Sequence, residues 1–192
     1  MLLLRHGETQ WSRDGRHTGR TDIPLTTAGE AQARALRPAL AALHPVAVLT
    51  SPLARAVRTA ELAGLHAAEV DPDLAEWDYG DYEGISTAEI RRTAPGWTVW
   101  AGPVPGGETL AAVAERADRV LERIARSLAA GDVVVVGHGH VNRVLAARWV
   151  GLPARCGQLL ALDTATVCLL GHEHEQQVIR LWNAPAAALG QL

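Results

Sequence analysis

The chain has 192 residues, of which 48% are apolar, and this length and composition fit one globular domain with a sizeable core. Its formal net charge of -3 excludes an overall basic field that would hold nucleic acid or an anionic membrane surface, so any anion site must be local. All 18 cationic side chains are arginine, which excludes lysine nucleophiles and leaves guanidinium groups, histidines and backbone amides to recognise an anion.

The first part of the chain predicts a buried strand, a long loop and a helix. Residues 2–4 form an apolar run ended by polar residues, which is typical of a strand buried on both faces. Residues 8–24 are polar and glycine-rich and predict a loop. Thr26 or Thr27 can then cap a helix with one leucine-rich face, and Pro38 should kink this helix or end it early.

The middle of the chain predicts a second strand and two further helices. Residues 46–49 form the next apolar run. Ser51 is a good N-cap, Pro52 suits the first helical position and Gly64 suits the exit from that helix. Apolar residues at helical spacing between residues 108 and 130 predict a long amphipathic helix with a charged outer face.

The last part predicts a third buried strand at residues 133–136, a helix at 139–149 and a loose, apolar tail at about 184–192. Between that helix and the tail we expect three short antiparallel strands, at residues 158–162, 166–170 and 177–182. The pattern as a whole predicts an α/β fold, a three-layer α/β/α sandwich with a mostly parallel mixed sheet.

Other features bear on the setting of the protein. Cys156 and Cys168 lack the spacing of a metal site or a disulfide framework, and we expect both to be reduced. No apolar run is long enough for a signal sequence or a membrane span, so we expect a soluble, cytoplasmic monomer or homodimer without a membrane or nucleic-acid partner.

Basic and polar residues directly follow the three strands that we expect to be parallel. They are Arg5 and His6 after the first, Ser51 and, one turn later, Arg55 after the second, and His138 and Gly139 after the third. In open α/β sheets a ligand lies beyond the carboxyl ends of the strands, where helix N-termini add free N–H groups and partial positive charge. The sequence therefore predicts a phosphate site with two arginines and two histidines at this edge.

A fourth feature is Glu76, in the acidic and aromatic stretch 74–84. A carboxylate beside a cationic pocket can give a proton to a leaving oxygen and then take one from water. Phosphoryl transfer needs positioning and charge stabilisation, which two arginines can supply without Mg²⁺. These residues predict phosphoester cleavage with no metal and no cofactor.

The motifs resemble those of the histidine phosphatase superfamily, in its phosphoglycerate mutase-like branch. They are Arg5-His6-Gly7-Glu8-Thr9, Gly15-Arg16-His17-Thr18-Gly19, Thr50-Ser51-Pro52-Leu53-Ala54-Arg55-Ala56, the Glu76 loop, Gly106-Gly107-Glu108 and His138-Gly139. The resemblance implies a phosphoglycerate mutase-like fold in a single domain, residues 1–192, with a short cap-like segment at about 76–107.

The resemblance also implies roles for individual residues. His6 becomes phosphorylated, Arg5 and Arg55 grip the phosphoryl oxygens, His138 completes the pocket and Glu76 is the proton donor. Further candidate phosphate-binding residues are Ser12, Thr18, Gly19 and Gly139.

These features predict a metal-independent phosphomonoesterase for small phosphorylated metabolites, acting through phosphohistidine. A sugar bisphosphatase of the sedoheptulose bisphosphatase type is an alternative, because the loops at Gly15 and Glu76 are similar in both groups. Two departures count against a phosphoglycerate mutase: Ser12 stands where mutases usually have asparagine, and the interval before His138 is short. A non-catalytic phosphate-binding module would not need a positioned proton donor.

Some residues permit more than one interpretation. Two pairs of alternating histidines could suggest a metal site, namely His138 with His140 and His172 with His174. No third and fourth ligand accompanies either pair. Among the arginines expected at the surface, one could contact a second phosphate: Arg58, Arg91, Arg92 or Arg143. Trp97 and Trp100 could form the rim of the pocket or anchor an irregular loop.

Overall fold

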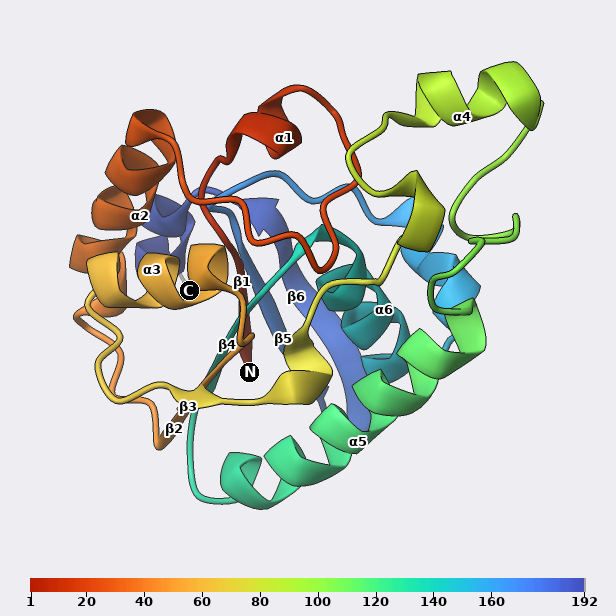
Figure 1. Ribbon diagram of the computed structural model, residues 1–192. Helices are drawn as coiled ribbons and strands as arrows, with labels where there is room; N and C mark the ends of the chain where they lie inside the picture. Colours follow the sequence, from red (N-terminus) through yellow and green to blue (C-terminus); the bar gives the residue numbers. More distant parts are fainter. Residues whose placement is uncertain (192) are drawn as a thin grey trace.

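A six-stranded mixed sheet forms the centre of the computed structural model, which describes residues 1–191 (Figure 1). The strand order is β3-β2-β4-β1-β5-β6. Strands β3, β2, β4 and β1 run parallel, β5 is antiparallel to β1, and β6 is antiparallel to β5. Their bounds are β1 Leu2–Arg5, β2 Ala47–Thr50, β3 Glu69–Val70, β4 Val133–Gly137, β5 Val167–Glu173 and β6 Gln176–Ala184. The predicted α/β fold with a mixed sheet is confirmed.

Helices cover both faces of the sheet (Figure 1). The α-helices are α1 Gln10–Arg13, α2 Thr27–Leu40, α3 Ala54–Leu62, α4 Thr87–Thr93, α5 Leu110–Leu128 and α6 Gly139–Trp149. Successive side chains of a strand point to opposite faces. Leu2 and Leu4 accordingly pack against α2 and α3, while Leu3 lies in the core with α5 and α6. Strand β4 is buried along its whole length, as its run of valines predicts.

The start of α3 differs from the prediction. Ser51 is not its N-cap, because the helix begins at Ala54 with Leu53 in the cap position. The Ala54 N–H donates instead to the carboxylate of Asp22, whose two oxygens lie 2.9 and 3.2 Å from the Ala54 nitrogen. Asp22 lies in the loop after β1. Its predicted end is confirmed, since Gly64 has a φ of +80°, a conformation that favours glycine.

Two predictions for the last part of the chain are wrong. Residues 158–162 form no strand: a 3₁₀ helix spans Ala154–Leu159, and the side chain of Leu159 is 77% exposed. The tail is not loose from residue 184, because a second 3₁₀ helix spans Ala186–Gln191 and Ala186 is buried in the core beneath α2 and α3. Residue 192 lies outside the described part of the chain.

Helix α4 lies in the loop-rich segment between η2, a 3₁₀ helix at Gly80–Tyr82, and α5 (Figure 1). Within residues 1–191, no helix combines the length and the apolar character that crossing a membrane requires.

Cys156 and Cys168 are both free thiols, and burial raises the pKa of Cys168 to about 12.

The loop after β1 touches the first turn of α2 through glycine backbones. A Cβ on Gly29 would lie 2.0 Å from the carbonyl oxygen of Glu8, and one on Gly7 would lie 2.4 Å from the carbonyl oxygen of Gly29. Backbone atoms cannot rotate away as a side chain can. This contact fixes the exit of the chain from β1, directly after His6.

We expect Gly29→Ala to lower the free energy of unfolding by about 1–3 kcal/mol, a typical cost of overpacking. Helix propensity alone favours alanine over glycine by about 1 kcal/mol, so the clash must reverse the sign. Urea unfolding followed by circular dichroism measures the change. Gly190→Ala is the control, because nothing lies within 4 Å of a Cβ placed there. A Gly29→Ala protein as stable as the parent would contradict the expectation.

Candidate active site

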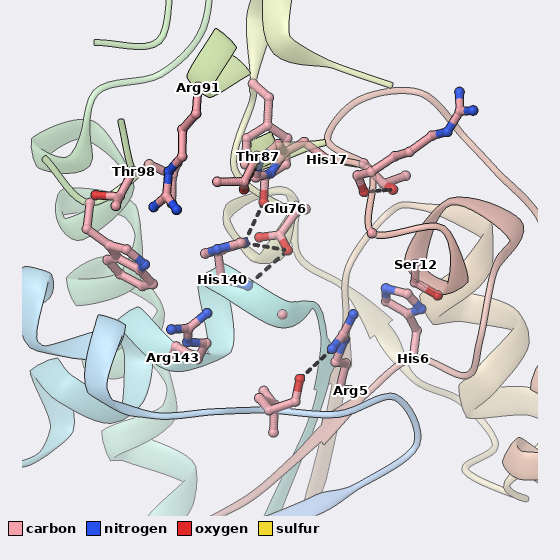
Figure 2. Close-up of a pocket in the computed structure, with 18 residues that line it drawn as sticks. Arg5, His6, Ser12, His17, Glu76, Thr87, Arg91, Thr98, His140 and Arg143 are labelled. Atoms are coloured by element: carbon pink, nitrogen blue, oxygen red, sulfur yellow. Dashed lines mark hydrogen bonds and ion pairs between the residues drawn. The ribbon is translucent and has the colours of Figure 1, made fainter. Parts of the chain in front are cut away.

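A cavity of about 380 Å³ lies at the ends of β1 and β4 (Figure 2). Cationic and imidazole groups dominate its lining, and Glu76 is the one carboxylate among the described residues that line it. The titratable groups of the lining are Arg5, Arg16, Arg91, Arg143, His6, His17, His140, Tyr79 and Glu76. Figure 2 shows His6 at one end of the group, Glu76 and His140 in the middle, and Arg91 and Arg143 at the other end. The arrangement suits an extended anionic ligand.

His6 is held in the form that a nucleophile needs. Its Nδ1 lies 2.7 Å from the carbonyl oxygen of Gly7, which can only accept, so Nδ1 carries the proton and Nε2 keeps its lone pair. The side chain is 4% exposed. Burial, and then the charges of Arg5 and Arg55, hold the pKa of His6 well below its ordinary value of 6.5. The imidazole is therefore neutral.

His138 lies directly behind His6, with 5.1 Å between the ring centroids, and does not line the cavity. Its Nδ1 accepts from Nε of Arg55 at 3.2 Å, so Nε2 carries the proton and donates to Oγ of Ser51 at 2.6 Å. Burial and the charge of Arg55 hold the pKa of His138 well below 6.5. A second neutral histidine thus packs behind the first.

The two predicted phosphate-gripping arginines have different surroundings. Arg5 lines the cavity and donates from NH1 to the carbonyl oxygen of Leu162, while its buried Nε has no hydrogen-bond partner within residues 1–191. A buried donor without a partner is costly, and an anion would satisfy it. Arg55 is fully buried and does not line the cavity.

The guanidinium of Arg55 instead joins a loop to His138. It donates to the carbonyl oxygens of Thr18 at 3.0 Å, Gly19 at 2.9 Å and Thr21 at 3.1 Å, besides its bond to His138. These bonds use most of its five N–H groups. Direct contact of Arg55 with phosphate stays a prediction.

Glu76 occupies the N-terminus of α6. Its Oε1 accepts from the backbone N–H groups of Trp77 at 2.9 Å and Val141 at 3.0 Å, and its Oε2 accepts from that of His140 at 2.9 Å (Figure 2). Carboxylates are favoured at a helix N-terminus, where N–H groups lack partners within the helix. The carboxylate is thereby fixed beside the cavity, and Oε2 accepts one hydrogen bond where Oε1 accepts two.

Tyr79 and His140 form a pair beside Glu76. Burial raises the pKa of Tyr79 well above 10, so its hydroxyl stays protonated and donates to Nδ1 of His140 at 2.6 Å. Burial and the charge of Arg143 hold the pKa of His140 well below 6.5. The neutral ring of His140 therefore has its proton on Nε2, as a donor for a substrate.

The other predicted phosphate-binding residues differ in how available they are. Ser12, Thr18 and Gly139 line the cavity, whereas Gly19 does not. The hydroxyl of Ser12 closes a capping box at α1, donating to the carbonyl oxygen of Thr9 and accepting from its N–H. The Gly19 N–H donates to Oε1 of Glu83 at 2.7 Å, so it is not directed at a ligand. In this structure the Gly19 N–H holds the loop to Glu83, and phosphate binding by Gly19 stays a prediction.

Several cavity residues were missed or left undecided by the sequence. They are His17, Tyr79, Thr87, Arg91, Thr98, Trp100, His140 and Arg143. Trp100 lines the cavity beneath the guanidinium of Arg143, 4.7 Å from the ring centroid, whereas Trp97 is buried and donates to the carbonyl oxygen of Pro103. The signal for Arg143 was its spacing, since residues three apart on a helix share a face and His140 precedes it by three.

No three histidine, cysteine or carboxylate side chains come together as a metal site would require, within residues 1–191. The two histidines at the His6 end of the cavity form hydrogen bonds with protein groups instead. His6 donates to a backbone carbonyl, and His138 bonds to Arg55 and Ser51.

Comparison with known proteins agrees with this geometry. Residues 1–185 match the Histidine phosphatase superfamily (branch 1). An acid phosphatase of Mycobacterium tuberculosis is 45% identical over 177 residues, which cover 91% of this chain and 87% of that protein. A sedoheptulose 1,7-bisphosphatase of Saccharomyces cerevisiae is 35% identical over 182 residues, which cover 79% of this chain and 67% of that protein.

A solved structure of an open reading frame product from Mycobacterium tuberculosis superimposes with a TM-score of 0.93 at 42% identity, and the match covers 96% of this chain and 97% of that one. Sequence and fold thus agree along almost the whole chain. The chain belongs to branch 1 of the histidine phosphatase superfamily and is a phosphatase.

Proposed function

We propose that the protein hydrolyses phosphomonoesters of small metabolites, without a metal, through a phosphohistidine on His6. The observation that carries this proposal is the state of His6: a neutral imidazole with Nδ1–H bonded to Gly7 and Nε2 free, at one end of a cationic cavity. A neutral imidazole is a nucleophile at a pH where an ordinary histidine would be partly protonated.

In the first step, Nε2 of His6 attacks phosphorus as the bond from phosphorus to the leaving oxygen breaks. Glu76, as the proposed proton donor, gives a proton to that oxygen, and the alcohol departs. Arg5 lies at the cavity with an unpartnered buried N–H and stabilises the transferred phosphoryl oxygens. Behind the nucleophile, Arg55 supplies a positive charge and neutral His138 supplies a dipole.

In the second step, water attacks the phosphohistidine and the N–P bond breaks. Glu76, now a carboxylate, accepts a proton from the water, so that inorganic phosphate leaves and both residues return to their starting states. The same carboxylate thus acts as acid and then as base.

We expect His6→Ala to lower kcat by at least about 10³-fold, because it removes the nucleophile. Rapid acid- and base-quench experiments with a ³²P-labelled phosphomonoester, run in excess chelator, should trap an acid-labile, base-stable adduct in the parent and none in the variant. His66→Ala, at an exposed histidine, is the control and should retain the adduct. Turnover by His6→Ala at the parent rate, or loss of parental activity in chelator, would overturn the proposal.

The pH profile tests the neutral state of His6. Because its pKa lies well below 6.5, the acidic limb of kcat/KM should lie below pH 6.5. Arg5 is the second cause of that lowering after burial, so Arg5→Gln should move the limb to higher pH while it also weakens binding. An unmoved limb in Arg5→Gln would show that another group titrates there.

A sugar bisphosphatase is the second candidate function, favoured by the far end of the cavity. Arg91 on α4 donates from Nε to the carbonyl oxygen of Trp97 at 2.8 Å, and Arg143 donates from Nε and NH2 to the carbonyl oxygens of Gly157 and Gln158. Both guanidinium groups line the cavity, at the end away from His6 (Figure 2). A second phosphate, or another anionic group, would suit this end.

We expect Arg91→Gln to reduce the preference for a sugar bisphosphate over the matching monophosphate by about tenfold, the effect of one charge-assisted hydrogen bond. The ratio of the two kcat/KM values measures the preference. Arg92→Gln is the control, since Arg92 is exposed on the same helix and does not line the cavity. Equal losses for both substrates would contradict a second anion subsite at Arg91.

A further inference from the structure

The Gly106-Gly107-Glu108 turn lies against the backbone that follows Glu76. The Glu108 N–H donates to the carbonyl oxygen of Asp78 at 2.9 Å, and the indole N–H of Trp77 donates to the carbonyl oxygen of Glu108 at 2.9 Å. A Cβ on Gly107 would lie 2.3 Å from the carbonyl oxygen of Asp78, and one on Gly80 would lie 2.3 Å from the N atom of Gly107. Glycine is needed there because two backbones meet without side chains between them.

The side chain of Glu108 extends the contact to α5. Its Oε2 accepts from the backbone N–H of Asp78 at 2.9 Å. Its two oxygens also accept from Nε and NH2 of Arg116, each at 2.9 Å, which is a bidentate ion pair. Arg116 is 7% exposed and Glu108 is partly buried, so this bidentate pair is partly shielded from solvent.

The remaining nitrogen of Arg116 reaches the other side of Glu76. Its NH1 donates to the carbonyl oxygens of Asp73 at 2.8 Å and Ala75 at 2.6 Å. The ion pair therefore holds the carbonyl group just before Glu76 and, through Glu108, the amide two residues after it. Glu76 lies between two fixed points of the backbone, with its carboxylate at the N-terminus of α6.

We propose that Glu108 and Arg116 are positioning residues that set Glu76 in line with the leaving oxygen, an inference that rests on the proposed function of Glu76 as proton donor. Neither residue lines the cavity, so neither touches the substrate. Their effect on catalysis passes through the backbone on both sides of Glu76.

The leaving group distinguishes positioning from simple structural support. An alkyl oxygen needs a proton to depart, whereas 4-nitrophenolate leaves without one. Loss of a positioned acid therefore slows the alkyl ester and spares the activated ester. The readout is the ratio of kcat/KM for glycerol 3-phosphate to that for 4-nitrophenyl phosphate, which covers the steps through departure of the leaving group and does not depend on the folded fraction.

We expect Glu108→Gln and Arg116→Gln each to lower this ratio by about 10- to 100-fold, in line with the cost of misplacing a catalytic group by about 1 Å. Glu76→Gln should lower it further, since it removes the acid itself. Arg119→Gln is the matched control. Arg119 lies on the same helix and pairs with Asp73 through its side chain, is 53% exposed and makes no contact with the backbone beside Glu76.

The outcomes separate the two levels of the proposal. If Glu76→Gln lowers the ratio but Glu108→Gln and Arg116→Gln leave it at the parent value, the positioning inference is overturned and the acid role of Glu76 stands. If Glu76→Gln also leaves the ratio unchanged, both are overturned. A fall in the ratio with Glu108→Gln and Arg116→Gln, absent with Arg119→Gln, supports the positioning role.

Discussion

The structure depends on holding the guanidinium groups that line the cavity through backbone carbonyl oxygens rather than through carboxylates. Arginines that line the cavity bond to backbone carbonyl oxygens: Arg5 to Leu162, Arg91 to Trp97, and Arg143 to Gly157 and Gln158. A carbonyl dipole fixes a guanidinium but leaves its charge uncancelled, whereas a carboxylate would neutralise it. Away from the cavity the pattern reverses, and Arg119, Arg123 and Arg148 pair with aspartates. The positive charge is thus kept for the substrate.

The two ends of the cavity arise from different kinds of structure. Arg5 is the last residue of β1 and His6 follows it, in the middle of the sheet, where β4 and β5 fix the backbone of β1 on both sides. Arg91, Thr98 and Trp100 come from the segment around α4, which is held by turns and side-chain contacts rather than by the sheet. Chemistry common to a family can reside at the rigid end while the other end changes with the leaving group.

The sequence predicted what depends on the order of the strands and missed what depends on individual hydrogen bonds. Arg5 ends β1 and His138 follows β4, and these two strands pair along their length, so the proximity of the two residues was readable from two apolar runs. The hydrogen-bond partners of Arg55 could not be predicted from the sequence. Thr18, Gly19 and Thr21 come from an irregular loop whose path no periodicity encodes. Likewise residues 158–162 look like a strand, but Gly157 and Gln158 lie in the 3₁₀ helix Ala154–Leu159, and their carbonyl oxygens accept hydrogen bonds from Arg143.

The neutral histidines have a consequence for the folded state as a whole. His6, His138 and His140 have pKa values well below 6.5, and burial lowers that of His17 to about 4. When the chain unfolds, these imidazoles reach water and regain ordinary proton affinity, so below about pH 6.5 the unfolded chain takes up protons that the folded one does not hold. Proton uptake thus favours unfolding progressively as the pH falls from 6.5 toward 4. The same neutral imidazoles that keep a nucleophile available in mild acid therefore lower the stability of the fold as the pH falls.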